Sequence, residues 1–220
     1  SYRLLTEDVA RFYLSDYLYI KMTILNLIFL YFFTIVISYL FGSFPSGYIL
    51  SKYFNKIDIT KQGSGNIGAT NVLRSGSKTL AVLTLLIDAL KGAIPVILFS
   101  FNGYLMAIAG LFSFLGHNFP VWLKFKGGKG IATYLGICFA VSLDLGVSFL
   151  ALWFLAALIF KTSSISSLIT ISLIPIISFF RLENNIISLV FLLMTINSFY
   201  KHKLNILRIL KGEEPKINIF

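Results

Sequence analysis

The chain has 220 residues, of which 57% are hydrophobic and 13% are charged, and its mean hydropathy is +0.84. A soluble domain carries about 25% charged residues, so this composition excludes a water-soluble core. Lysine and arginine outnumber aspartate and glutamate by 19 to 9, yet long stretches carry no charge, so the basic residues are concentrated between apolar segments. The single cysteine, Cys138, excludes an internal disulfide, and the chain has no Cys/His set for a metal.

Residues 1–21 differ from the rest because they mix acidic and basic side chains, and they stop just before Met22. They lack the basic start, the apolar run and the small-residue cleavage site of a signal peptide. We interpret them as a short tail or as translated upstream sequence. We expect residues 22–220 to form a single membrane-embedded domain, which then carries the whole positive surplus.

A membrane-spanning helix needs about 20 mostly apolar residues. Apolar windows that meet or approach this length cover residues 22–51, 79–101, 92–123, 130–143, 145–160, 162–180 and 186–200, and Asn102-Gly103 marks a turn between the helix that ends near 101 and the next one. The sequence therefore predicts an all-α, polytopic integral membrane protein with about seven transmembrane helices. Two of these, at 130–143 and 145–160, are short.

Lysine and arginine in short loops mark the cytoplasmic side of a membrane protein. If the N-terminus lies outside, the basic loops 52–78 and 124–129, Lys161 and the basic tail all lie inside, and only Arg181 remains outside. A shallow hairpin in place of the two short crossings keeps the same sidedness. One merged crossing would move the tail outside, so we reject it and expect a cytoplasmic C-terminus.

The first polar segment is Gly42-Ser43-Phe44-Pro45-Ser46-Gly47, near the inner end of the first helix. Glycine and proline loosen a helix and leave backbone groups that need partners, which is tolerated beside protein or a polar cavity. A simple proline kink is the alternative.

The second segment, residues 63–74 (GSGNIGATNVLR), is small and polar. Glycines allow successive N–H groups to face one point as an anion nest, and Arg74 adds a planar charged fork. The predicted phosphate-binding residues here are Gly63, Ser64, Gly65, Asn66, Gly68, Thr70 and Arg74. The dinucleotide fingerprint is rejected, because it requires a preceding strand; a flexible linker is the other alternative.

The third segment runs from Gly116-His117-Asn118 to the basic glycine run at 124–130, KFKGGKG. Helix N-terminal N–H groups and lysine charge would converge there on an anion, so Lys126, Gly127 and Gly128 are also predicted phosphate-binding residues. It is not a Walker loop, because Gly130 rather than Ser or Thr follows Lys129. A basic loop that only sets topology is the alternative.

Two further pairs of residues stand out. Asp88 and Lys91 lie three residues apart inside a spanning helix, where ionisable residues indicate function, although a lysine that reaches the surface with a neutralising aspartate explains them equally well. His202 and Asn205 follow the last helix at the inner surface. A histidine there titrates near neutrality or binds phosphate, or is a solvated tail residue.

From about Met22 to the end, these residues resemble the bacterial membrane acyl-phosphate:glycerol-3-phosphate acyltransferases. The resemblance rests on the three polar segments at 42–47, 63–74 and 116–133, and on the Asp88/Lys91, His202/Asn205 and Glu214/Lys216 positions. The family usually carries arginine at the position of Thr60. Lys61 follows here as a point charge, and we count it among the predicted phosphate-binding residues, although it cannot make a bidentate contact.

The resemblance implies transfer of a fatty acyl group from acyl phosphate to the 1-hydroxyl of glycerol 3-phosphate. It implies no cofactor and no nucleic acid, with acyl phosphate, glycerol 3-phosphate and membrane lipid as partners, in the bacterial plasma membrane with a cytoplasmic active site. The oligomeric state is not predicted. The predicted catalytic residues are Ser43, Asn71, His117, Lys129, His202 and Asn205.

The sequence disfavours three alternative functions. Soluble-type glycerolipid acyltransferases use a histidine with an aspartate five residues later, but Trp122 and Leu207 stand at that distance from the two histidines here. A transporter or channel for an anionic solute is disfavoured, because the chain has no repeat symmetry. A scaffold subunit would not need three donor-rich segments on one face.

Overall fold

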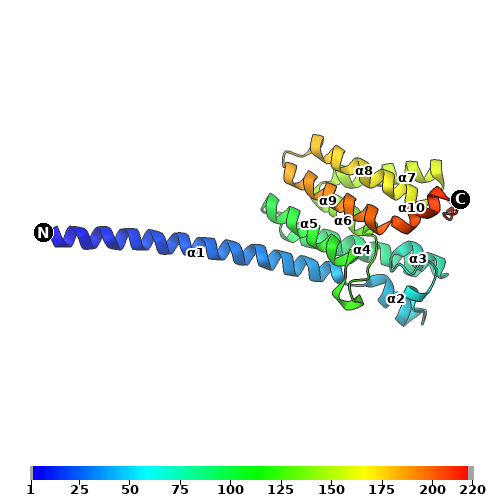
Figure 1. Cartoon of the computed structure of the whole chain (residues 1–220), viewed down its shortest axis with the longest axis horizontal. Coiled ribbons are helices and arrows are strands. Elements are labelled where there is room, and N and C mark those ends of the chain that lie inside the picture. Colours follow the sequence, from blue (N-terminus) through cyan, green and yellow to red (C-terminus); the bar gives the residue numbers. More distant parts are fainter. Residues whose placement is uncertain (1, 218–220) are drawn as a thin grey trace.

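The computed structural model describes the backbone of residues 2–217 and the side chains from residue 20 onward, and within this range all regular elements are helical. The α-helices are α1 (Tyr2–Ser43), α2 (Ser46–Phe54), α3 (Ala69–Arg74), α4 (Lys78–Leu98), α5 (Gly103–Asn118), α6 (Ile131–Val141), α7 (Leu143–Phe160), α8 (Ser163–Arg181), α9 (Asn185–Lys201) and α10 (Lys203–Leu210). Two single 3₁₀ turns are η1 (Ile59–Lys61) and η2 (Val121–Leu123). In Figure 1, α1 runs well beyond the bundle that the other helices form.

Five segments within the described residues are long and apolar enough to cross a membrane: Ile20–Phe54, Lys78–Leu98, Gly103–Leu123, Leu143–Phe160 and Ser163–Arg181. Two shorter apolar helices are Ile131–Val141 and Asn185–Lys201. The all-helical membrane fold is therefore confirmed. The prediction that the helix at 145–160 is short was wrong. The helix begins two residues earlier, because Leu143 and Asp144 belong to its first turn and bring α7 to 18 residues. Seven crossings and the orientation of the termini stay predictions.

The segment at 42–47 interrupts the helix completely. α1 ends at Ser43, and Pro45 precedes the first residue of α2. Gly42 brings α1 against α5, since a Cβ there would lie 1.9 Å from the carbonyl oxygen of Ser113. Small residues allow such close backbone approach in membrane bundles. The break is thus a true end of α1, and the alternative of a simple kink is wrong.

The same device joins α4 to α6. A Cβ at Gly136 would lie 1.9 Å from the carbonyl oxygen of Ala89, and one at Gly92 would lie 2.5 Å from that of Thr133. Tyr134, also on α6, packs against the rings of Phe114, Phe149 and Phe191. Its hydroxyl lies 3.2 Å from the Thr195 hydroxyl. These contacts hold the short helix α6 against four other helices, α4, α5, α7 and α9.

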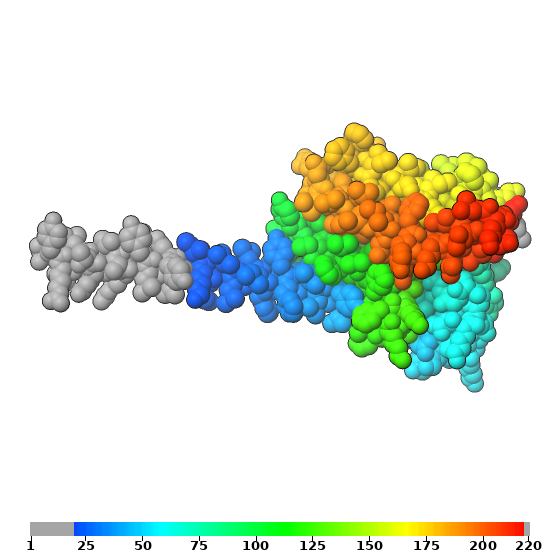
Figure 2. Space-filling model, in the orientation of Figure 1, coloured from blue at the N-terminus to red at the C-terminus, as the bar shows by residue number. Residues whose placement is uncertain are grey.

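The polar segments collect at one end of the bundle. Figures 1 and 2 show α2 and α3 at the same end as α10 and the C-terminal tail, with the tail lying beside α7 and α8. The backbone N–H of Ile217 donates to the carbonyl of Lys161 at 2.8 Å, which fixes the tail next to the start of α8. Segments far apart in the sequence therefore surround one region.

Candidate active site

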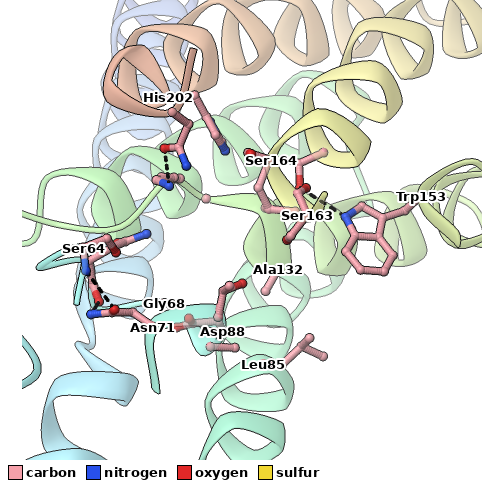
Figure 3. A pocket seen from close by; sticks show the side chains of 18 of the residues that line it. Ser64, Gly68, Asn71, Leu85, Asp88, Ala132, Trp153, Ser163, Ser164 and His202 are labelled. Carbon is pink, nitrogen blue, oxygen red and sulfur yellow. Dashed lines mark hydrogen bonds between the residues drawn. The ribbon is translucent and has the colours of Figure 1, made fainter. Parts of the chain in front are cut away.

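A cavity of about 270 Å³ lies between these segments (Figure 3). Its polar wall comprises Ser64, Asn66, Gly68, Thr70, Asn71, Arg74, Asp88, His117, Lys129, Ser163, Ser164, Ser167, His202, Asn205 and Glu214. Its apolar wall includes Leu85, Ile131, Leu135, Phe149, Leu150 and Trp153. In Figure 3, Ser64 and Asn71 lie across the cavity from Trp153. The cavity therefore combines charged and polar groups with a lipid-like apolar surface.

Asn71 organises the turn that leads into α3. Its side-chain nitrogen donates to the carbonyls of Gln62 and Asn66, both at 2.9 Å, and to that of Ile59 at 3.2 Å. Its side-chain oxygen accepts from the backbone N–H of Ser64 at 3.1 Å. All of its polar atoms thus have backbone partners, so Asn71 shapes the site through the turn.

The glycine turn at residues 63–65 uses its backbone N–H groups within the protein, so few of them are free to bind an anion. Gly63 and Gly65 have φ angles of +55° and +68°, which glycine tolerates best. The N–H of Gly65 donates to the carbonyl of Gln62 at 2.9 Å, and the N–H of Ser64 is held by Asn71. Neither glycine lines the cavity. The positive charge of the site therefore comes from the side chains of Arg74 and Lys129 rather than from a nest at these two residues.

Lys129 enters the cavity at the end of the connection between α5 and α6. Its ammonium group donates to the side-chain oxygen of Asn205 at 2.6 Å. Burial lowers the pKa of Lys129 to about 8, against the opposing effect of the Glu214 carboxylate. The group is therefore largely cationic at neutral pH but close to its titration.

Glu214 closes a network that sequence reasoning did not include in the site. One of its oxygens accepts from Asn205 at 2.6 Å and from Ser164 at 2.7 Å, and the other accepts from Arg208 at 2.7 Å. Partial burial raises the pKa of Glu214, but the hydrogen bonds from these three residues outweigh it and leave the pKa lowered. A carboxylate thus fixes Asn205 and, through it, Lys129.

His202 is buried on the cavity wall, and its Nδ1 lies 2.8 Å from the carbonyl oxygen of Ser198. A carbonyl can only accept, so Nδ1 carries the proton and Nε2 is the free acceptor when the ring is neutral. Burial, followed by the charge of Lys129, lowers the pKa of His202 to about 4. At neutral pH this residue is an uncharged base.

Asp88 and Lys91 are both buried on α4, and together they hold the break between α1 and α2. Their charged groups lie 2.7 Å apart. Asp88 also accepts from the Ser46 hydroxyl at 2.6 Å, and Lys91 donates to the Phe44 carbonyl at 2.7 Å. Lys91 is only 4% exposed, so it does not reach toward the membrane surface. From α4, the pair therefore binds the interruption between α1 and α2 through Ser46 and Phe44, while Asp88 also lines the cavity.

His117 is buried beside this pair, with its Nδ1 3.5 Å from the nearer Asp88 oxygen, beyond a good hydrogen bond. The N–H of Gly128 donates to the His117 carbonyl at 3.1 Å. A Cβ at Gly128 would lie 2.0 Å from Nε2 of His117, and one at Gly127 would lie 2.2 Å from its carbonyl oxygen. These glycines therefore allow the basic loop to pack on His117 and do not line the cavity themselves.

Five of the six predicted catalytic residues meet at the cavity, and Ser43 does not. It is buried where α1 packs on α5, since a Cβ at Gly116 would lie 2.7 Å from its backbone nitrogen. Of the predicted phosphate-binding residues, Lys61, Gly63, Gly65, Lys126, Gly127 and Gly128 lie outside the cavity lining. The Lys61 side chain is 83% exposed, and its ammonium group lies 3.9 Å from the Asp58 carboxylate.

Some lining residues were not in the predicted site. Besides Glu214, they include Asp88 and three serines of the first turns of α8, of which Ser167 accepts from the indole N–H of Trp153 at 3.1 Å. The signal for the serines was their density directly after Lys161 in an otherwise apolar chain. The signal for Glu214 was only its place in the family pattern.

The family whose sequence profile matches residues 32–212 is described as glycerol-3-phosphate acyltransferase. The chain is 48% identical over 185 residues to the glycerol-3-phosphate acyltransferase of Pelagibacter ubique, covering 83% of this chain and 95% of that protein. It is 45% identical over 188 residues to that of Bartonella henselae, covering 83% and 89%.

A solved structure has the same fold. The crystal structure of PlsY, an integral membrane glycerol 3-phosphate acyltransferase in its glycerol 3-phosphate form, matches with a TM-score of 0.81 and 33% identity, covering 86% of this chain and 96% of that one. Its lysophosphatidic acid form matches with a TM-score of 0.79. With a cavity that combines cationic and apolar walls, this chain belongs to the glycerol-3-phosphate acyltransferase family of integral membrane proteins.

Proposed function

We propose that the chain transfers a fatty acyl group from acyl phosphate to the 1-hydroxyl of sn-glycerol 3-phosphate and releases lysophosphatidate and inorganic phosphate, the first step of phospholipid synthesis. The bond between the acyl carbon and the phosphate oxygen breaks, and an ester bond to the glycerol oxygen forms. The observation that carries the proposal is that Lys129 and Arg74 line the same cavity as the apolar surface of α6 and α7.

Bringing the substrates together is an electrostatic problem, because both are phosphate dianions. Two unit charges about 4 Å apart repel by roughly 1 kcal/mol even in water, and by more in a partly buried site. Lys129 and Arg74 offset this repulsion. An acyl phosphate is already activated, so positioning and stabilisation of the carbonyl oxyanion supply the acceleration without a covalent enzyme intermediate.

The glycerol hydroxyl must lose a proton as it attacks. His202 is neutral at the working pH, lines the cavity and keeps Nε2 free, so we assign it as the proton acceptor. The Lys129 ammonium, held by Asn205, stabilises the developing negative charge on the acyl carbonyl. A phosphate oxygen of the substrate is the alternative acceptor.

The acyl chain lies along the apolar wall. Leu85 on α4 and Leu150 on α7 line the cavity, and Leu86 and Val147 on the same two helices, outside the cavity lining, are 50% and 53% exposed. The wall therefore continues to a face that lies against lipid when the bundle is in a membrane. The donor enters sideways from the bilayer, with its phosphate at the polar end. The basic loops favour the cytoplasmic side for that end. We propose that the chain forms seven crossings in the bacterial inner membrane.

The test is release of inorganic phosphate by the purified protein in lipid nanodiscs with palmitoyl phosphate and glycerol 3-phosphate. We expect equal amounts of phosphate and lysophosphatidate, and no product with palmitoyl coenzyme A. Lys129→Ala should abolish most of the release. Product formation from the coenzyme A thioester alone would disprove the assigned donor, and no acyl transfer from either donor would favour a transport protein.

A further inference from the structure

The connection after α5 carries an exposed cluster of large apolar side chains. Val121, Trp122 and Phe125 are 41%, 63% and 59% exposed, and Lys124 and Lys126 beside them are also exposed. We call residues 119–126 the aromatic loop. Contiguous apolar exposure rimmed by charge marks an interaction surface.

The backbone of the aromatic loop holds these side chains outward. Lys124 and Phe125 have φ angles of +51° and +62°, in the left-handed region that residues with a Cβ seldom adopt. The N–H groups of Leu123 and Phe125 both donate to the carbonyl of Pro120, at 3.1 and 3.0 Å. Two successive left-handed residues persist only where the surroundings fix them, so the shape of the loop is specified.

The base of the loop is fixed to the bundle. The Tyr39 hydroxyl donates to the carbonyl of Phe119 at 2.7 Å, and the Lys201 ammonium lies 4.4 Å from the centre of the Phe119 ring. Just before the loop, Gly116 packs against Ser43 at the last turn of α1. The loop therefore begins at the level where the long apolar helix ends, which is the level of a membrane surface.

A second element of the same composition lies next to it. At the end of α2, Tyr53 and Phe54 are each 72% exposed, and Lys52 is exposed beside them. Figures 1 and 2 show α2 and the connection after α5 projecting on the same side of the bundle. Aromatic residues combined with lysine are characteristic of protein surfaces at the headgroup level, where the rings are half immersed and the charges meet anionic lipids.

We propose that the aromatic loop is an interfacial anchor for an anionic phospholipid surface. Trp122 and Phe125 insert among the lipid headgroups, and Lys124 and Lys126 contact the anionic phosphates. Lys129 follows three residues after Lys126, so the anchor fixes the height of the cavity's lysine relative to the bilayer. This role is separate from acyl transfer, and it gives Lys126 a partner outside the cavity.

The two tryptophans of the chain allow a direct test. In Trp153→Phe protein, Trp122 is the remaining tryptophan, and excitation at about 295 nm avoids the tyrosines. We expect phosphatidylcholine vesicles with bromine atoms near the headgroup end of the acyl chains to quench most of its emission, and aqueous iodide to quench little. Quenching by iodide with none by brominated lipid would place Trp122 in water, or at a site for a soluble protein, and would overturn the proposal. If Trp153→Phe does not fold, the quenching of the unmodified protein is compared with that of Trp122→Phe. The part of the lipid quenching that Trp122→Phe loses then belongs to Trp122.

A second experiment tests whether the loop lysines contact anionic lipid. Raising the phosphatidylglycerol fraction should increase quenching by brominated lipid in the Trp153→Phe protein, and Lys124→Gln/Lys126→Gln in that background should lose this increase. Lys211→Gln/Lys216→Gln, two exposed lysines of the C-terminal tail, is the matched control and should keep it. An equal response in both double variants would show that the loop lysines bind no anionic lipid.

Discussion

The ammonium group of Lys129 donates to the side-chain oxygen of Asn205 at 2.6 Å, although 76 residues separate them. The orientation of the Asn205 amide follows from its other partner, because the Glu214 carboxylate can only accept, at 2.6 Å from the amide nitrogen. Asn205 must therefore present its oxygen to Lys129. The lysine is positioned by the C-terminal segment as much as by its own glycine loop.

The rate of acyl transfer should fall as the pH rises through about 8, where the cavity's lysine loses its proton. The protonated form offsets the phosphate charge and stabilises the carbonyl oxyanion, so the contribution of Lys129 is complete below this pKa and is lost above it. His202, with a pKa of about 4, stays neutral throughout and does not limit this range. Lys129→Arg keeps its charge at every accessible pH, so its alkaline limb should disappear even if its maximal rate is lower. Initial rates of phosphate release across neutral and alkaline pH test this, and an unchanged limb in the arginine variant would assign it to another group.

Arg74→Ala should raise the KM for glycerol 3-phosphate by roughly ten- to a hundredfold, because a hydrogen bond to a charged group contributes about 1.5–3 kcal/mol. Thr60 lies outside the cavity lining, where its hydroxyl donates to Asp58 at 2.6 Å. Thr60→Arg adds a positive charge next to the glycine turn, so it should lower the KM, and by a larger factor in the Arg74→Ala variant than in the unmodified protein. Steady-state kinetics of the two single variants and the double variant measure the coupling; strictly additive effects would show that the two positions serve different groups.

Glu214→Gln should lower the stability of the protein by about 2 kcal/mol and raise the KM for glycerol 3-phosphate, because the neutral amide cannot accept from Asn205, Ser164 and Arg208 together. The lowered pKa of Glu214 means that its contribution is present above the ordinary pKa of a glutamate and is lost as the pH falls through the folded value. Thermal unfolding in detergent at neutral and acidic pH measures the loss of stability and its pH dependence, and steady-state kinetics measure the KM; unfolding temperatures that match the unmodified protein at both pH values would contradict this role. Glu213→Gln, at the exposed neighbouring position, is the control and should behave as the unmodified protein.

Asp88→Asn should destabilise the protein by about 3–5 kcal/mol, because it leaves the Lys91 ammonium buried without its counter-charge. Asp88→Asn/Lys91→Met removes both charges and should recover much of this loss. The control is Asp144→Asn, since Asp144 and Arg181 form an ion pair whose side chains are 52% and 65% exposed, and such pairs contribute less than about 1 kcal/mol. Denaturant unfolding of the four proteins decides the matter: equal losses in Asp88→Asn and Asp144→Asn would contradict a structural role for the buried pair.

Local pattern was enough for the membrane architecture. Uncharged windows of about 20 residues have few other uses, and a bilayer accepts only helices or closed barrels, so the all-helical membrane fold followed directly. Pro45 between two glycines was enough to place the interruption after α1. The length of α7 was misjudged because Asp144 was taken as a boundary, whereas a charged residue in the first turn at a membrane surface is compatible with a helix.

The sequence by itself determined the class of protein, its family and the three segments rich in polar groups, because hydropathy and local motifs are properties of neighbouring residues. Only the tertiary structure decided which of those groups share a cavity. Lys61 and Lys126 match the phosphate-binding pattern but remain outside the cavity lining, whereas Glu214 enters from the C-terminal tail and Asp88 binds Ser46 on another helix. These contacts depend on which helices become neighbours, and that is set by close glycine packing and long-range hydrogen bonds that no local pattern encodes.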